Sequence, residues 1–254
     1  MSIISVRHVF KAFGKHVVLK DVLLEIEEGK TLVVIGPSGT GKSVLLKHIV
    51  GLLKPDKGDV YFDGQCINSL TARELAATRT NFGFLFQMGA LFDSLTNAEN
   101  VAFPLVEHTK KTPEEIRKIV LEKLAMVGLP NVGNKMPGEL SGGQRKRVAL
   151  ARAIAMDPKV ILYDEPTTGL DPIRSDVINE LILKLQREIN VTSIVVTHDM
   201  ISATKVANRI VMLQGGTLHF DGTADEIRHS PDPDVQRFVQ GRASEEELAS
   251  LETK

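Results

Sequence analysis

The sequence predicts an α/β fold with a helical subdomain inserted into its core. Three short runs, residues 31–35, 160–163 and 193–196, are apolar and rich in β-branched side chains, which is typical of buried strands. A helical pattern follows the first run, as expected where strands and helices alternate. From about residue 71 to 157 helix signals dominate instead. We therefore place the inserted subdomain at about residues 88–157.

The N-terminal segment predicts two strands joined by a polar loop. Residues 3–10 alternate loosely between apolar and polar side chains, and around Leu24 and Ile26 apolar residues alternate with glutamates. Residues 11–15 form the expected loop, which carries the aromatic residue Phe13. Its ring could stack on a nucleotide base or be a minor part of the core, and this segment alone leaves both alternatives open.

A glycine-rich loop follows the strand at 31–35. It fits the phosphate-binding pattern G-x-x-x-x-G-K-[ST] with Gly36, Pro37, Ser38, Gly39, Thr40, Gly41, Lys42 and Ser43. Ile49 and Leu52 continue a helical pattern that Pro55 stops. Backbone N–H groups of the loop and the positive end of this helix can bind phosphate oxygens. Lys42 can reach the β- and γ-phosphates and Ser43 can bind Mg²⁺, so the loop predicts a nucleotide site.

Two helix starts mark the middle of the chain. Residues 58–64 predict a short strand between turns, and Thr71 with Glu74 then has the spacing of a capping box. A second helix is expected to begin after Thr112, because proline occupies its first position, and to end at Gly128. These signals make the middle third of the chain helical.

Polar side chains end two of the three buried runs. Asp164 and Glu165 follow one run, and His198 lies just beyond another. Ligands of α/β proteins bind at the carboxyl ends of the strands, so we expect these residues to converge on the phosphate loop. Asp164 can hold Mg²⁺, Glu165 can take a proton from the attacking water, and His198 can donate to the γ-phosphate or position that water. The other histidines, including His48, are expected to be structural.

A second helix end able to bind an anion is predicted at Ser141, Gly142, Gly143 and Gln144. Ser141 would cap this helix. One chain need not bring both anion-binding ends to one phosphate, but a head-to-tail pair of chains could supply one end each. Arg145, Lys146 and Arg147, which follow, are expected to form a solvated basic face.

The C-terminal third continues the same pattern. Residues 177–185 predict a helix, and Gly215 with Gly216 between two apolar runs predicts a hairpin. The globular domain is expected to cover residues 1–240 and to end in one amphipathic turn. Residues 241–254 form an acidic tail that we expect to be solvated.

Composition excludes several classes of protein. The chain has 254 residues, 43% hydrophobic and 25% charged, with a net charge of -1, so it lacks the basic balance of a bulk nucleic-acid binder. The single cysteine, Cys66, rules out an internal disulfide and fits a reducing cytoplasm. No stretch approaches the ~20 apolar residues of a spanning helix, and residues 1–7 lack a secretory signal. We therefore expect any membrane role to depend on a partner.

Over residues 3–225 the chain resembles the nucleotide-binding subunits of ABC transporters. The shared motifs are the phosphate loop at 36–43, a glutamine loop at Gln87, the signature at 140–144, the strand 160–164 with Glu165, the turn at 169–171 and a switch histidine at His198. The resemblance implies a P-loop NTPase fold with a RecA-like core, an antiparallel β subdomain and an inserted helical subdomain. It also implies that the chain hydrolyses ATP with Mg²⁺.

The resemblance assigns roles to the site residues. It implies a two-chain sandwich with each ATP between the phosphate loop of one chain and the signature of the other. It makes Phe13 the adenine-stacking residue, where the family often has tyrosine, and Asp171 an interface residue. The implied catalytic residues are Lys42, Glu165 and His198, and the implied Mg²⁺ site is Ser43, Gln87 and Asp164. The turn before Asp171 is Thr-Gly-Leu instead of the commoner Ser-Ala-Leu, a variant that keeps the aspartate.

Three segments narrow the resemblance. Residues 137–139 are similar to importer-type subunits, and residues 82–92 with 97–105 are similar to the ATPase of the maintenance-of-lipid-asymmetry (Mla) phospholipid transporters. The resemblance implies phospholipid transport across a Gram-negative-type envelope. Its partners would be a membrane permease, a lipid-binding protein with a mammalian-cell-entry (MCE) domain and, in some systems, a small STAS-domain subunit. The chain would then lie at the cytoplasmic face of the inner membrane, bound through the permease.

Two alternatives remain open from the sequence. One is the ATPase of a small-solute importer. The other is a non-transport ABC ATPase of translation or DNA maintenance, where we would expect two such domains in one chain or a long coiled-coil insertion. Residues 88–92 are unusually apolar for a loop. They could receive a permease helix or pack inside the subdomain, and both can hold for different residues.

Overall fold

The computed structural model describes residues 1–243. Most of the predicted acidic tail, including its glutamates at 245–247, lies outside the described residues. Within that range, no helix combines the length and hydropathy needed to cross a bilayer.

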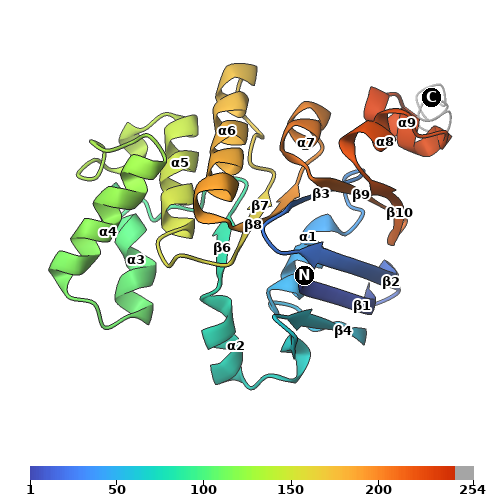
Figure 1. The fold of residues 1–254 in the computed structure, drawn as a ribbon, viewed down its shortest axis with the longest axis horizontal. Helices are drawn as coiled ribbons and strands as arrows, with labels where there is room; N and C mark the ends of the chain where they lie inside the picture. Colours follow the sequence, from blue (N-terminus) through green and yellow to red (C-terminus); the bar gives the residue numbers. More distant parts are fainter. Residues whose placement is uncertain (244–254) are drawn as a thin grey trace.

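A small antiparallel sheet lies in the lower right part of the view in Figure 1, below β10 and α8. Its strand order is β2-β1-β4-β5, with strands β1 (Ser2–Phe13), β2 (His16–Glu27), β4 (Lys57–Phe62) and β5 (Gln65–Cys66). The polar loop expected at 11–15 is wrong in extent, because β1 runs on to Phe13. Ala12 pairs with Val17 there, and only a two-residue turn remains, with Gly14 at a φ of 60°.

A second sheet carries the strands that the apolar runs predict. Its order is β10-β9-β3-β8-β7-β6, with strands β3 (Thr31–Ile35), β6 (Phe82–Leu85), β7 (Val160–Asp164), β8 (Thr192–Val196), β9 (Arg209–Gln214) and β10 (Thr217–Gly222). The strands from β9 to β6 are parallel, and β10 pairs antiparallel with β9. The predicted hairpin is confirmed, with Gly215 and Gly216 at φ values of 58° and 87°.

The central strands of this sheet are apolar throughout because both faces are covered. On β3, Val33 packs into the cluster formed with the helices around α5, and Val34 packs into the cluster formed with the small sheet and α1 (Lys42–Ile49). Neither side chain has an exposed surface. A parallel sheet buried in this way brings the carboxyl ends of β3, β7 and β8 to one edge.

The helices besides α1 are α2 (Ala72–Arg79), α3 (Asn97–His108), α4 (Pro113–Met126), α5 (Gly142–Ala153), α6 (Pro172–Ile189), α7 (Met200–Val206), α8 (Ala224–Arg228) and α9 (Pro233–Gln240). In Figure 1, α3, α4 and α5 gather at the left end of the molecule, away from the small sheet. They also contact one another directly. This grouping matches the helical insertion that the sequence predicts.

Side-chain caps fix most helix starts. The capping box predicted at Thr71 is confirmed. Thr112 caps α4 as predicted and also forms a box, with Glu115, and Thr223 has one as well. A further box at Thr96 begins α3, a helix that was not predicted from the sequence. Pro104 lies inside α3, and proline is a residue that normally argues against a helix interior.

The helix after the phosphate loop is shorter than its apolar pattern suggests. It ends at Ile49, and Gly51 turns the chain with a φ of 67°. Leu52 therefore lies beyond the helix and is 53% exposed, so its expected place on the helix face is wrong. His48 is buried and its Nδ1 lies 2.7 Å from the Val44 carbonyl, which confirms a structural role.

Candidate functional site

The phosphate loop joins β3 to α1 through three glycines with positive φ. Gly36 has a φ of 143°, and a Cβ there would lie 2.1 Å from the carbonyl oxygen of Leu213. Gly41 has a φ of 99° and forms the N-terminal cap of α1 in the left-handed conformation. Since glycine offers no side chain to cap the helix, the first N–H groups of α1 remain free to bind an anion.

Lys42 folds back over this loop. Its Nζ donates hydrogen bonds to the carbonyl oxygens of Gly36 at 2.8 Å and Pro37 at 2.9 Å. Burial lowers the pKa of Lys42, while the nearby carboxylates of Glu165 and Asp164 raise it. An ammonium group in such a partly desolvated position attracts phosphate oxygens more strongly than one in open water.

An oxygen pair lies beside the loop. The hydroxyl of Ser43 donates to Oδ1 of Asp164 at 3.4 Å, across the adjacent ends of α1 and β7. Burial raises the pKa of the Asp164 carboxyl, and the charge of Glu165 raises it further. A hydroxyl and a carboxylate are ligands that Mg²⁺ accepts, and a bound cation would offset the burial cost of the Asp164 charge. The residues present therefore fit a divalent cation.

Glu165 lies at the next position and is held on several sides. Its carboxylate Oε2 lies 2.9 Å from Nδ1 of His198 and accepts a hydrogen bond from the hydroxyl of Thr168 at 3.2 Å. Its backbone N–H donates to the carbonyl of Val196 at 2.9 Å, with the residue at a φ of 50°. A glutamate rarely adopts this left-handed conformation, and such strain concentrates at functional sites.

These residues line one cavity of about 450 Å³. Its predicted members are Phe13, Ser38, Gly39, Gly41, Lys42, Ser43, Gln87, Asp164, Glu165 and His198. The structure thus brings five residues of the phosphate loop together with the three strand-end residues, the glutamine and the aromatic residue. The other predicted loop residues, Gly36, Pro37 and Thr40, are not among the lining residues. Phe13 is 48% exposed, so its ring lies at the edge of the cavity and is not a core residue.

The second predicted anion site lies elsewhere. Ser141 caps α5, as predicted, and it also forms a capping box with Gln144. Among the residues that the structure describes, neither the segment 141–144 nor Asp171 contributes to the lining of the cavity. Asp171 instead caps α6, accepting a hydrogen bond from the N–H of Arg174 at 2.9 Å. One chain therefore does not bring the two helix ends that are predicted to bind anions to the same cavity.

The solvated basic face expected at 145–147 holds only for Arg145, which is exposed; Lys146 is buried and Arg147 is half-buried. Each of the three side chains donates to a backbone carbonyl, Arg145 to Leu140, Lys146 to Pro166 and Thr168, and Arg147 to Val127. Lys146 is only 6% exposed. A signal was present in the sequence, because Lys146 lies three residues after Gly143 and four before Leu150, on the face that α5 buries.

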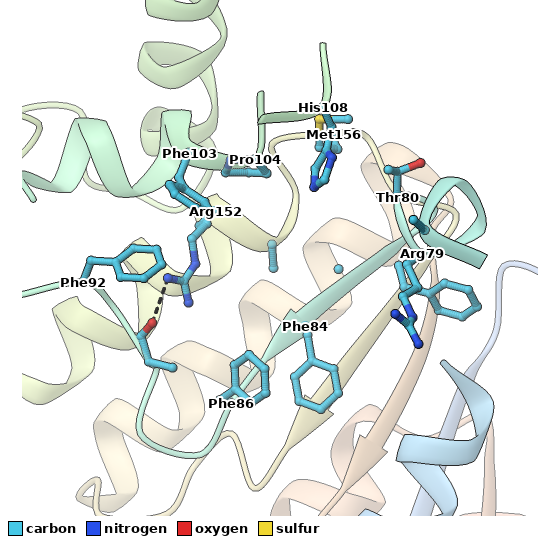
Figure 2. Close-up of a pocket in the computed structure, with 15 residues that line it drawn as sticks. Arg79, Thr80, Phe84, Phe86, Phe92, Phe103, Pro104, His108, Arg152 and Met156 are labelled. Carbon is cyan, nitrogen blue, oxygen red and sulfur yellow. Dashed lines mark hydrogen bonds between the residues drawn. The ribbon is translucent and has the colours of Figure 1, made fainter. Parts of the chain in front are cut away.

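A second cavity, of about 520 Å³, lies at the base of the helical group (Figure 2). Five phenylalanines line it. Four of them form two pairs with ring centroids 4.2 and 4.8 Å apart: Phe84 with Phe86, and Phe92 with Phe103. Arg79, His108 and Arg152 also face it (Figure 2). We call this cavity the aromatic groove.

The apolar segment at 88–92 divides between the two predicted roles. Met88 is 85% exposed, whereas Leu91 packs against the core. Arg152 anchors the segment by donating to the carbonyls of Gly89 and Ala90, both at 2.8 Å. One part of the segment is therefore structural, and another part is available to a partner.

Comparisons with known proteins agree with this geometry. A family model described as "ABC transporter" matches residues 19–168. The chain is 46% identical over 239 residues to the "Probable ribonucleotide transport ATP-binding protein mkl" of Mycobacterium leprae, covering 94% of this chain and 69% of that protein. It is 43% identical over 242 residues to the "Intermembrane phospholipid transport system ATP-binding protein MlaF" of Haemophilus influenzae, covering 95% and 92% respectively.

A solved structure supports the same fold. The ATP-binding cassette MJ0796, in a dimeric post-hydrolysis state bound to ADP and Pi, superposes with a TM-score of 0.79. The two chains are 39% identical, and the match covers 87% of this chain and 98% of that one.

Proposed function

The chain belongs to the ABC transporter family and is one of its ATPases, and from this premise we propose that it powers phospholipid transport between the membranes of a Gram-negative-type envelope. The proposal that the cargo is phospholipid rests on the match to the phospholipid transport protein of Haemophilus influenzae, which extends over 92% of that protein. The mycobacterial relative is named for ribonucleotide transport instead. A small-solute importer is therefore the second candidate.

The geometry supports a definite arrangement of the nucleotide. The phosphates bind the backbone N–H groups of the loop at 36–43, including those of Ser38 and Thr40. The ammonium group of Lys42 binds the β- and γ-phosphates. Phe13 at the edge of the cavity stacks on the adenine. Ser43, Asp164 and Gln87 would hold Mg²⁺, which would supply positive charge to offset that of the phosphate oxygens.

Glu165 acts as the general base in this proposal. Its carboxylate takes a proton from the water that attacks the γ-phosphate. Thr168 and His198 both bind Oε2, so they fix the direction of the carboxylate. A protonated imidazole donates from both nitrogens, so His198 in that form can bind Glu165 and a γ-phosphate oxygen together.

The separation of the two anion-binding helix ends supports a dimer. We place each ATP between the phosphate loop of one chain and the segment 141–144 of a second chain, arranged head to tail, with Asp171 near the contact. Among the described residues of a single chain, those that line the cavity include none of the segment 141–144. The solved relative is a dimer bound to ADP and Pi, which agrees with this arrangement.

The aromatic groove is the proposed contact with a membrane permease. Phe86 lines the groove and directly precedes Gln87 of the nucleotide cavity, so a shift at either place can reach the other. The permease would hold the chain at the cytoplasmic face of the inner membrane. An MCE-domain lipid-binding protein and a STAS-domain subunit complete the proposed complex, and no nucleic acid takes part.

The test is to isolate the tagged chain from detergent-solubilised membranes and to identify its proteins and lipids by mass spectrometry. A permease together with an MCE-domain protein and bound phospholipid is the expected result. A permease with a small-solute binding protein would replace the cargo and keep the ATPase role. Recovery with ribosomes, and without a membrane protein in several detergents, would instead favour a non-transport ABC ATPase.

A further inference from the structure

Lys146 is a buried lysine that the proposed mechanism does not use. It lies on α5, two residues after the signature segment, and is 6% exposed. Its Nζ donates to the carbonyl oxygens of Thr168 at 2.7 Å and Pro166 at 2.8 Å, and the carbonyl oxygen of Glu165 lies at 3.5 Å. A buried ammonium group is retained only where its donors are satisfied, and here three N–H groups face three carbonyls.

The contacts of Lys146 continue through Thr168 to the carboxylate of Glu165. The carbonyl of Thr168 accepts from Lys146, and its hydroxyl donates to Oε2 of Glu165 at 3.2 Å. The N–H of Thr168 also donates to the carbonyl of Glu165 at 3.3 Å, which closes the turn. Lys146 therefore holds both the backbone of this turn and the residue that directs the Glu165 side chain.

The same face of α5 touches the segment that follows this turn. Gly142 lies against Leu170, and Gly143 lies against the side chain of Arg174. Lys146 is one helical turn further along this face. The signature helix thus rests on the chain from the Glu165 turn to the start of α6.

We propose that Lys146 is a positioning residue, which fixes the turn at 165–168 so that the carboxylate of Glu165 points at the attacking water. This proposal rests on the general-base role proposed for Glu165. It also gives α5 two tasks, because its first residues face a second chain while Lys146 holds the general base of its own chain. A displacement of the signature helix α5 would then change the position of the Glu165 carboxylate.

The physical reason is the strain at Glu165. Its φ of 50° is a conformation that an L-residue leaves unless its surroundings hold it. Burial lowers the pKa of Lys146 to about 8, and the charge of Glu165 opposes this shift. A neutral amine has two N–H groups, so the charged form is the one that can serve all three carbonyls.

The experiment measures steady-state ATP hydrolysis by the full chain, with three variants compared with the wild type. Lys146→Met keeps the length of the side chain and removes its donors, whereas Lys146→Arg keeps charge and donors. Lys184→Met is the matched control, because Lys184 also donates to a backbone carbonyl, that of Met126 at 3.0 Å, away from the cavity. ATP binding is titrated and thermal unfolding is recorded for each.

We expect Lys146→Met to lower kcat about tenfold to hundredfold, the range for a slightly misplaced catalytic group, with KM for ATP within about twofold of wild type. Lys146→Arg should recover most of kcat, and Lys184→Met should match the wild type. An unchanged kcat in Lys146→Met, or a change in KM alone, would overturn the proposal. If the methionine variant does not fold, Lys146→Gln is measured in the same way.

A double-mutant cycle distinguishes positioning from a general structural effect. In a Glu165→Gln background, measured by single turnover, Lys146→Met should cause no further loss, because the group it positions is gone. A full, additive loss there would show that Lys146 acts elsewhere. Glu165→Gln alone tests the general-base role, and hydrolysis near the wild-type rate in that variant would refute it. If Glu165→Gln is inactive but Lys146→Met hydrolyses ATP as the wild type does, only the positioning role of Lys146 is refuted.

Discussion

Glu165 and His198 meet at the ends of two neighbouring parallel strands, with Oε2 of the glutamate 2.9 Å from Nδ1 of the histidine. The glutamate side chain is 15% exposed and the histidine side chain 63%. A sheltered carboxylate therefore contacts an imidazole that reaches the open part of the cavity. Glu165 can therefore act as a base whose direction is fixed by its neighbours. The exposed imidazole of His198 can also contact the nucleotide.

Glu165→Gln should leave ATP binding intact and lower the rate of hydrolysis by about 10²- to 10⁴-fold, the usual contribution of a general base. The amide keeps the size of the side chain and loses the proton acceptor. ATP turnover and nucleotide titration, measured on the same preparation, check the two parts separately. Turnover close to that of the wild type would remove Glu165 from the base role.

Lys42→Ala should weaken ATP binding itself. The substitution removes the ammonium group that the carbonyls of Gly36 and Pro37 hold inside the loop. Loss of a charge-assisted contact to phosphate is expected to cost about 1.5–3 kcal/mol, or roughly tenfold to hundredfold in Kd. Lys47→Ala, an exposed lysine on the same helix, is the control in a nucleotide titration. Equal affinity in wild type and Lys42→Ala would contradict the assignment.

The core of the site was predictable because its signals are local. The runs that became β3, β7 and β8 are buried on both faces, so they are apolar throughout and stand out from their surroundings. Parallel strands in one sheet end at one edge, which places Asp164, Glu165 and His198 beside the phosphate loop. The motif order then identified the family.

The errors arose where tertiary contacts outweigh local pattern. Lys146 looks solvated among three basic residues, and only the turn at 165–168, far away in sequence, provides the carbonyls that accept its donors. Phe13 could not be assigned from its segment, because the extension of β1 decides where its ring lies. Helix α3 was not predicted because Pro104 lies in its interior, although the capping-box spacing at Thr96 marks its start.

Gly36→Ala should destabilise the fold as well as the site. An added Cβ would lie 2.1 Å from the backbone carbonyl of Leu213, which cannot move without disturbing β9, and the φ of 143° is strained for alanine. We expect a loss of about 1–3 kcal/mol or more in the free energy of unfolding, measured in urea. Gly39→Ala is the control, because no atom lies within 4 Å of its Cβ position and only the backbone strain remains. A smaller loss in Gly36→Ala than in Gly39→Ala would contradict the steric argument.

As the pH is lowered, Mg²⁺-dependent nucleotide binding should weaken at a higher pH than it would if the metal ligand were an aspartate with an ordinary pKa. Burial, and secondly the charge of Glu165, raise the pKa of Asp164 above 3.8. The folded protein therefore holds this proton at a pH where an exposed aspartate would have lost it, and the proton competes with the metal. Binding should be complete above the raised pKa and decline as the pH falls through it.

Titrating nucleotide affinity against pH, with and without Mg²⁺, measures this competition. Asp164→Asn is the control, since its amide cannot take up the proton, and it should remove the Mg²⁺-linked part of the pH dependence. A Mg²⁺-linked decline that persists unchanged in Asp164→Asn would place the titrating group elsewhere.

Phe103→Glu should separate the chain from its membrane partner. Phe103 pairs with Phe92 in the aromatic groove and is 40% exposed, so a carboxylate there would have to lose water if an apolar helix packed against it (Figure 2). Leu121→Glu is the control, because Leu121 is 51% exposed on α4 and lines a different cavity. We expect Phe103→Glu to lose the permease in a membrane pull-down while the purified chain still binds ATP, and Leu121→Glu to retain it. Since the two substitutions add the same charge to the same group of helices, equal recovery of the permease would show that the groove is not the contact.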